Sequence, residues 1–209
     1  VDLGLLFFFK YLNFFVENIC AVTGFKAPTI DVALPLGISF YTFQIMSYII
    51  DVYRKKYPAG RNLIEVAAYI SMFPQLIAGP IVTFDEVQPR LRERKISPAN
   101  IENGLLLFVV GLVYKVMLAN QIAALWNDVM VAGVMGINTA TAWLGAWGYS
   151  MQIYFDFLGY SLMAIGMGYM LGFKFPKNFS NPYCAVSVTD FWRRWHITLG
   201  RWFREYVYI

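Results

Sequence analysis

Residues 139–172 read TATAWLGAWGYSMQIYFDFLGYSLMAIGMGYMLG and form the longest apolar run of this 209-residue chain. A run of this length makes one tilted membrane-spanning helix, or a helix that breaks at Gly159. Gln152 and Asp156 lie one helical turn apart within it, and a carboxylate at the bilayer centre costs roughly 3 kcal/mol. Their face is therefore expected to point at protein or water. Asp156 is then half of a structural polar pair, part of a cavity wall, or a partner of His196.

The composition of the whole chain favours a membrane protein. Hydrophobic residues make up 58% of the chain and charged residues 14%, whereas soluble domains carry about 25% charge. The net charge of +4 is gathered in short basic runs, among them residues 54–56 and 90–95. Such runs mark cytoplasmic loops and contacts with anionic membrane lipid, and they are too short to favour nucleic acid. The sequence predicts an all-α, polytopic transmembrane protein in which residues 1–209 form a single membrane-embedded domain.

The chain ends and the cysteines carry weaker signals. The sequence begins at Val1 without an initiator methionine and ends at Ile209 inside an aromatic, basic run, so we expect a fragment that lacks both ends. Cys20 and Cys184 are far apart and match no metal-ligand spacing. Each is expected to be a small buried apolar residue. With one histidine and no cluster of cysteines or acids, the sequence predicts no metal site.

Three apolar segments precede the middle of the chain. Residues 3–19 are typical of the second half of a spanning helix, or of a helix that runs out into the interface. Residues 30–52 are long enough to span the membrane. Residues 63–84 are interrupted by two prolines and a glycine. Because basic runs flank this third segment on both sides, residues 73–82 are expected to be re-entrant, with a proline-kinked spanning helix as the alternative.

A further helix is predicted from its start signal. Ser97 is followed by proline at the first helical position and by acid in the first turn, and the helix is expected to reach about Asn120. Residues 122–135 continue it, or form an interfacial helix anchored by Trp126. Lys115 is expected to extend its ammonium group to the membrane surface.

The last twenty residues read DFWRRWHITLGRWFREYVYI and hold the one histidine of the chain. We expect a final helix capped by Thr189 or Asp190, on which Trp192, His196 and Gly200 share one face. A neutral imidazole can take a proton from a hydroxyl as a general base. Nearby guanidinium groups and an apolar wall would lower its pKa, and arginines can hold a phosphate. The alternative is an interfacial anchor helix, which explains the tryptophans and arginines but not the histidine.

Five runs of the chain resemble the membrane-bound O-acyltransferase family, in particular its bacterial branch that acetylates alginate and peptidoglycan. The runs are LPLGISFYTFQ (34–44), SYIIDVYR (47–54), FPQLIAGPI (73–81), QIYFDF (152–157) and FWRRWHITL (191–199). The resemblance covers nearly the whole chain. It departs at Leu158 and Leu162, where relatives commonly carry serine and aspartate, and this leaves the acceptor open.

The resemblance implies a membrane enzyme that moves an acetyl or other acyl group from a cytoplasmic thioester donor to hydroxyls of an extracytoplasmic polysaccharide. It implies no bound cofactor, since acetyl-CoA or an acyl carrier protein is a substrate. It also implies a periplasmic partner and a location in the bacterial inner membrane. His196 matches the family's catalytic histidine, and a second family histidine would lie after Ile209, so which of the two is the base stays open. The supporting or cavity-lining residues are expected to be Gln152, Asp156, Trp192, Arg193 and Arg194.

Two other functions remain open from the sequence. A D-alanyl transferase of the teichoic acid type is similar but more distant. A channel or transporter component would place Asp156 in a permeation path, although such a protein usually spreads intramembrane charges over several helices.

Overall fold

All regular structure in the described part of the chain is helical. The structure is a computed structural model and describes residues 2–25, 35, 37–60, 62–76 and 79–208. Its helices are α1 (Asp2–Leu6), the π-helix η1 (Phe7–Tyr11), α2 (Leu12–Thr23), α3 (Ile38–Tyr53), α4 (Leu63–Ile70), α5 (Phe73–Leu76), α6 (Phe84–Arg92), α7 (Pro98–Val113), the π-helix η2 (Tyr114–Ala119), α8 (Asn120–Gly136), α9 (Thr139–Met170), the 3₁₀ helix η3 (Pro182–Cys184), α10 (Val188–Arg194) and α11 (Ile197–Tyr206). The predicted all-α class is confirmed.

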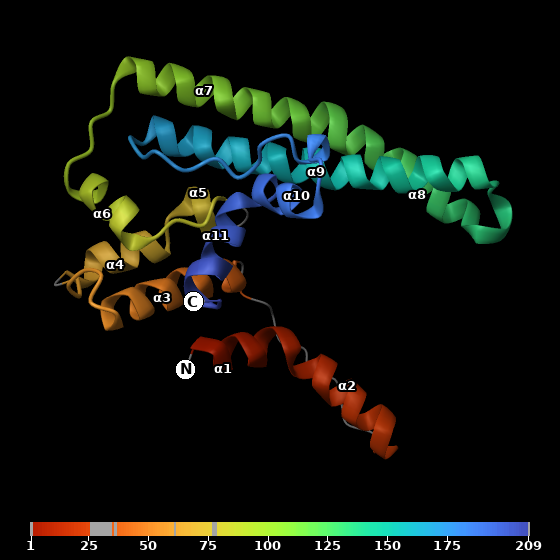
Figure 1. Ribbon diagram of the computed structural model, residues 1–209, viewed down its shortest axis with the longest axis horizontal. Helices are drawn as coiled ribbons and strands as arrows, with labels where there is room; N and C mark the ends of the chain where they lie inside the picture. The colour runs from red at the N-terminus through yellow and green to blue at the C-terminus, as the bar shows by residue number, and fades with distance from the viewer. Residues whose placement is uncertain (1, 26–34, 36, 61, 77–78, 209) are drawn as a thin grey trace.

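Two long antiparallel helical segments form one side of the molecule (Figure 1). The first runs without interruption from α7 through η2 into α8, and α9 returns along it. Glycines allow the two backbones to touch: a Cβ at Gly104 would lie 2.6 Å from the carbonyl oxygen of Gly166, and one at Gly111 equally close to that of Gly159. Small residues serve in this way where helices pack inside a membrane. Gly159 therefore marks a contact, and α9 continues through it as one 32-residue helix.

Among the residues that the structure describes, two helical segments are long and apolar enough to cross a bilayer, namely Leu3–Thr23 and Pro98–Gly133. The second includes the predicted helix and its continuation. Ser97 caps it, because the Ser97 hydroxyl accepts a hydrogen bond from the amide of Asn100. Trp126 does not stand alone as an anchor, since its ring stacks on Tyr149 of α9 at a centroid distance of 4.7 Å.

The expectation for Lys115 was wrong. Its ammonium group forms an ion pair with Asp156 of α9 and lies 5.2 Å from the ring centroid of Tyr160. Both charged side chains are largely covered, with 25% and 34% of their surfaces exposed. A lysine extends its ammonium group to the membrane surface when its side chain faces lipid. The Lys115 side chain faces helix α9 instead. Of the three alternatives for Asp156, the structure therefore supports the structural polar pair. Its partner, Lys115, lies in the π-helical turn η2.

The segment after α3 is broken, as predicted. Helices α4 and α5 are short, residues 80–83 are not helical, and a capping box between Thr83 and Glu86 starts α6. Tyr69 and Phe84 are fully buried in the core here, and the Tyr69 hydroxyl donates to the carbonyl of Val82. Residues 77 and 78 lie outside the described part. The re-entrant path through a membrane stays a prediction.

Helix α3 is shorter than predicted from residues 30–52. It begins at Ile38, after Gly37 adopts a left-handed φ of +75°; residues 30–34 and 36 lie outside the described part. Sixteen residues cover about 24 Å, less than the hydrocarbon core of about 30 Å. A buried hydrogen bond from Gln44 to Gln75 ties α3 to the broken segment.

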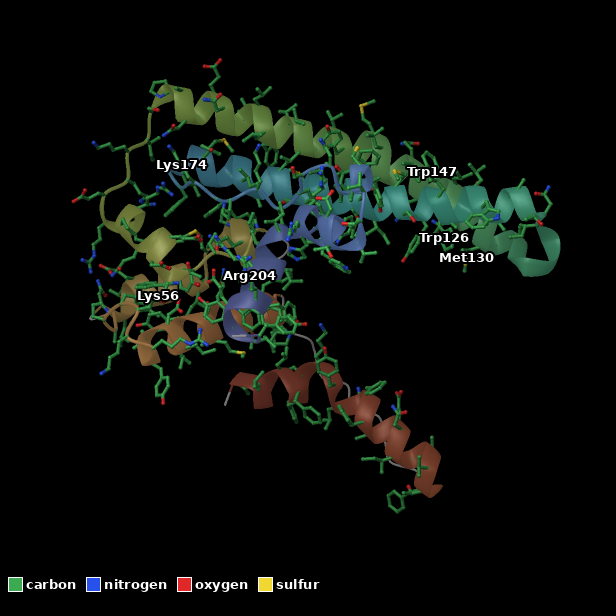
Figure 2. All side chains as sticks on the ribbon, in the orientation of Figure 1. Lys56, Trp126, Met130, Trp147, Lys174 and Arg204 are labelled. Carbon is green, nitrogen blue, oxygen red and sulfur yellow. The ribbon has the colours of Figure 1, made fainter. Side chains whose placement is uncertain are left out.

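The two ends of the molecule differ in their side chains. Figure 2 shows Lys56 and Lys174 on the side where α3, α4 and α6 lie, and Trp126, Met130 and Trp147 at the far end of α8 and α9. Trp147 is 61% exposed and Met130 59% exposed, and an exposed tryptophan is typical of a membrane interface. The burial expected for the cysteines is wrong for Cys184, which is exposed, while Cys20 is partly covered.

We predict that Lys115→Leu destabilises the intact protein by about 3 kcal/mol, because it leaves the Asp156 carboxylate unpaired among apolar helices. The double variant with Asp156→Leu should recover most of that loss. The midpoint of thermal unfolding in detergent measures both. A single variant as stable as the wild type would show that the ion pair contributes nothing.

Candidate functional site

His196 lies at a break between two helices. Helix α10 ends at Arg194 and α11 begins at Ile197, so the single final helix predicted from the sequence is wrong. His196 itself has φ +43° and ψ +54°, a left-handed conformation that costs a residue with a Cβ about 1 kcal/mol. Such conformations persist where the surroundings fix them and are concentrated at functional sites. The cap of α10 is also corrected, because it is Ser187, which accepts from the amide of Asp190.

The loop 171–187 holds His196 in place. The His196 Nδ1 atom lies 2.9 Å from Oδ1 of Asn178, a side chain only 1% exposed. Two backbone hydrogen bonds fix the break on either side: the amide of Ile197 donates to the carbonyl of Asn178, and the amide of Ser180 donates to that of Arg194. The ring of Phe157 from α9 meets the imidazole edge to face at 4.7 Å.

Thr198 connects this arrangement to the broken segment. Its hydroxyl donates to Asn178 Oδ1 at 2.9 Å, and its backbone amide donates to the same oxygen at 3.3 Å. The hydroxyl in turn accepts from the amide of Ile81 at 3.0 Å. Thr198 is 1% exposed. Three chain segments, the loop, the break and the broken segment, are therefore linked by hydrogen bonds that lead through Thr198 and Asn178 to His196.

Burial lowers the pKa of His196 to about 4. The cause is removal of water from the ring, which disfavours the imidazolium form. The guanidinium groups that the sequence led us to expect as a cause do not contribute. The imidazole is neutral near pH 7 and can accept a proton.

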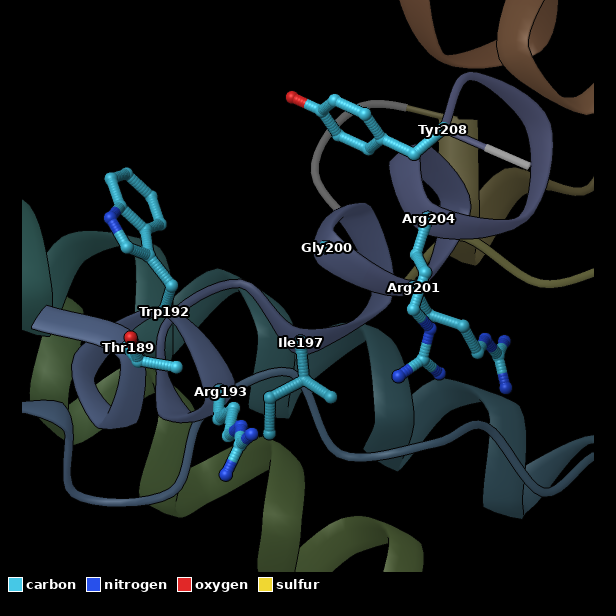
Figure 3. Close-up of a pocket in the computed structure, with 8 residues that line it drawn as sticks. All are labelled: Thr189, Trp192, Arg193, Ile197, Gly200, Arg201, Arg204 and Tyr208. Atoms are coloured by element: carbon cyan, nitrogen blue, oxygen red, sulfur yellow. The ribbon is translucent and has the colours of Figure 1, made fainter.

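Two adjoining pockets lie along α10 and α11. One has a volume of about 520 Å³ and an apolar wall; Trp192, Trp195, His196, Leu199, Gly200, Phe203 and Tyr208 line it. The other is about 850 Å³ and shares Trp192, Gly200 and Tyr208 with the first. Figure 3 shows this larger pocket with Arg193, Arg201 and Arg204 extending toward the same side.

The four arginines near this site differ in their partners. Arg194 is held by Asp190 one turn earlier, with Nε 2.9 Å from Oδ1, and Arg201 is held by Glu86 of α6 at 2.8 Å. Arg193 and Arg204 are exposed at the larger pocket. Arg193 thus lines the larger pocket, whereas Arg194 is engaged in an ion pair, and a functional role of either stays a prediction.

The predicted residues of α9 lie away from His196. Asp156 pairs with Lys115, so the alternative of an Asp156 partner for His196 is wrong. Gln152 lies on the same face of α9, and its side-chain oxygen is buried without a hydrogen bond in the described part. The helix reaches the site one residue later, through Phe157. Pro74 and Gly79 of the broken segment line a separate pocket of about 170 Å³ against α7 and α9.

Asn178 and Thr198 were missed as site residues. Asn178 stands in the run KFPKNFSNPY, whose prolines and asparagines are typical of a loop. The signal that could have found it is a buried asparagine, because a polar group inside a protein needs a hydrogen-bond partner. Burial within a loop is not visible in the sequence.

Comparison with known proteins places the chain. The model of the membrane-bound O-acyltransferase family matches residues 58–209. The chain belongs to this family. It is therefore a membrane protein, and the predicted resemblance is confirmed.

Named relatives belong to three kinds of transferase. The chain is similar to the probable alginate O-acetylase of Pseudomonas putida, with 46% identity over all of this chain and 44% of that protein. It is 37% identical to the peptidoglycan O-acetyltransferase of Helicobacter pylori, again over all of this chain and 44% of the relative. The teichoic acid D-alanyltransferase of Bacillus subtilis is more distant, with 32% identity over 83% of this chain and 45% of the relative. The chain thus spans less than half the length of these relatives.

We predict that His196 makes the intact protein less stable in acid. Its pKa is about 4 in the folded protein against 6.5 when solvated, so between these values the unfolded chain binds more protons and stability falls as the pH is lowered. His196→Asn should lose this part of the pH dependence, and asparagine tolerates the left-handed backbone. Unfolding midpoints from pH 7 to pH 4 measure the difference. Parallel curves for the two proteins would contradict the buried neutral ring.

Proposed function

We propose that this chain carries the catalytic centre of a membrane O-acyltransferase that moves an acetyl group from a thioester donor to hydroxyls of a polysaccharide outside the cytoplasm. The observation that supports it is the neutral, partly buried imidazole of His196 at an apolar pocket that adjoins a larger, arginine-lined one. An apolar pocket suits the acyl group, and the arginines suit an anionic donor. The family and its named relatives agree with acyl transfer.

The reaction needs one proton acceptor. The hydroxyl oxygen of the acceptor bonds to the carbonyl carbon of the thioester while His196 takes the hydroxyl proton. Collapse of the tetrahedral adduct breaks the carbon–sulfur bond, and the proton passes to the departing thiolate. With a pKa of about 4 the imidazole is unprotonated throughout the physiological range, and it accepts the proton as the hydroxyl oxygen bonds to the carbonyl carbon.

The donor is a phosphate-bearing thioester, either acetyl-CoA or an acyl carrier protein. Arg193 and Arg204 are the exposed guanidinium groups of the larger pocket, and guanidinium groups bind phosphate oxygens through paired hydrogen bonds. Trp192 lies between the two pockets and contributes to both walls. We place this enzyme in the bacterial cytoplasmic membrane, with membrane lipid around it and a periplasmic protein that completes transfer to the polymer.

The second candidate is transfer of D-alanine to teichoic acid, favoured by the relative of Bacillus subtilis. Its lower identity and smaller coverage place it behind acetylation. A channel or transporter component is disfavoured, because the Asp156 charge is engaged by Lys115 rather than presented to a permeation path.

We predict that His196→Asn abolishes acetylation of the polymer in the intact protein, with a loss of at least about 1,000-fold, because general-base catalysis and correct orientation are removed together. Asparagine suits the backbone at φ +43°, so membrane insertion and unfolding temperature at pH 7 should be unchanged. Acetyl content of the polymer and initial rates with labelled acetyl-CoA measure the effect. Retained acetylation would refute the role.

We predict different kinetic effects for neighbouring arginines. Arg193→Ala and Arg204→Ala should each raise the KM for acetyl-CoA by about 10-fold, because one phosphate contact is lost. Arg194→Ala is the matched control, since its guanidinium is already paired with Asp190, and should change KM by less than about 2-fold. Equal effects at all three positions would point to general surface charge instead.

A further inference from the structure

We propose that Asn178 and Thr198 are positioning residues that hold His196 with its proton on Nδ1, so that Nε2 is the atom that receives the acceptor's proton. This inference rests on the proposed function of His196. It adds two residues of the site and assigns the tautomer.

The orientation of the Asn178 amide follows from a backbone group. The amide N–H of Thr198 can only donate, and it points at the Asn178 side chain from 3.3 Å. The Asn178 atom that faces it must therefore be the oxygen, since an NH₂ group in that place would set two donors against each other. No exchange of the amide oxygen and nitrogen satisfies this contact.

The same oxygen then decides the state of the imidazole. It lies 2.9 Å from His196 Nδ1, and because an amide oxygen can only accept, Nδ1 must carry the hydrogen. In a neutral imidazole the other nitrogen, Nε2, is then unprotonated. This is the form that a general base requires.

Thr198 gives the chain of hydrogen bonds its direction. Its hydroxyl accepts from the amide of Ile81, so the hydroxyl hydrogen is free to point at Asn178 Oδ1, 2.9 Å away. The relay runs from the Ile81 amide through Thr198 to Asn178, and His196 donates to the same oxygen. Because a backbone N–H can only donate, the donor and acceptor of each hydrogen bond in this relay cannot be exchanged. Arg201 supports Ile81 through its carbonyl and is itself paired with Glu86.

The Asn178 NH₂ group makes no hydrogen bond within the described part of the chain. The amide thus acts on its neighbours through its oxygen alone. Asn178→Asp places a carboxylate oxygen where that acceptor is and sacrifices no donor contact in this part, so it is the conservative variant. Asn178→Leu removes the acceptor at similar volume.

Charged and titratable groups around the ring bear on any pH test. Tyr208 shares the ring's pocket, Arg193, Arg201 and Arg204 line the adjoining one, Tyr154 of α9 lies beside Trp195, and Glu86 of α6 reaches the relay through Arg201. None of them is hydrogen-bonded to the imidazole in the described part. Asn178→Asp adds a negative charge in direct contact with the ring, so its effect on the ring should be specific.

The test uses the intact membrane enzyme and two readouts. The first is the ¹⁵N spectrum of His196, assigned by its absence in His196→Asn. The wild type should show a protonated Nδ1 and an unprotonated Nε2. Asn178→Leu and Thr198→Val should show a mixture of tautomers, whereas Thr198→Ser and Asn178→Asp should keep the wild-type pattern. This readout needs no activity, so it separates failure of the relay from failure of the proposed reaction.

The second readout is the pH profile of kcat/KM for acetyl transfer. Asn178→Leu should lose about 100-fold or more, because a misassigned tautomer disables a catalytic histidine, and Thr198→Val about 10-fold, with Thr198→Ser within about 2-fold of wild type. Asn178→Asp should be more active than Asn178→Leu and should move the acidic limb to higher pH. If Asn178→Leu fails to fold, the threonine pair alone decides. A wild-type tautomer and pH profile in Thr198→Val, or an Asn178→Asp variant no more active than a folded Asn178→Leu variant, would overturn the proposal.

Discussion

A single side-chain oxygen, Oδ1 of Asn178, is the point on which the site depends. It is reached by His196, by the Thr198 hydroxyl and by the Thr198 amide. An amide oxygen inside a protein is costly to leave unpaired, so burying it compels the chain around it to supply donors. The break between α10 and α11 does this, because a continuous helix would have used the amides of residues 197 and 198 for its own hydrogen bonds. The strained φ of His196 is thus the consequence of satisfying a buried neighbour.

The long helices serve this site from a distance. Glycine contacts between α7 and α9 bring the two backbones together, and the Lys115–Asp156 pair fixes their register by charge. While Asp156 is paired with Lys115 of η2, α9 presents Phe157 to the imidazole. An aromatic ring in that position keeps water from one side of His196 and accounts for part of the burial that lowers its pKa. Helix α9 therefore affects the pKa of His196 by excluding water from the ring and not by placing a charge beside it.

The sequence predicted the helical class, the start of α7 at Ser97 and the break after α4, because each has a local signal or a match to family motifs. The catalytic role of His196 stays a prediction. The sequence did not predict the break at His196, since neither glycine nor proline stands at residues 195 and 196. It also misjudged Lys115, because a sequence shows that a charge lies in an apolar run but not which helix lies opposite. Asn178 escaped notice for the same reason. Its role comes from burial in a loop, and burial is a property of the packed chain.

The arrangement separates two demands that a single cluster of residues could not meet together. A general base must be neutral, which favours dry and uncharged surroundings, whereas an anionic donor needs exposed cations. Here the imidazole lies on the apolar pocket and the exposed guanidinium groups of Arg193 and Arg204 line the adjoining one, with Trp192 shared between them. Two other arginines of this segment, Arg194 and Arg201, are paired with Asp190 and Glu86. Pairing those two leaves Arg193 and Arg204 as exposed guanidinium groups of the larger pocket, so the proposed proton acceptor and the proposed phosphate binders lie on neighbouring turns of one short chain segment.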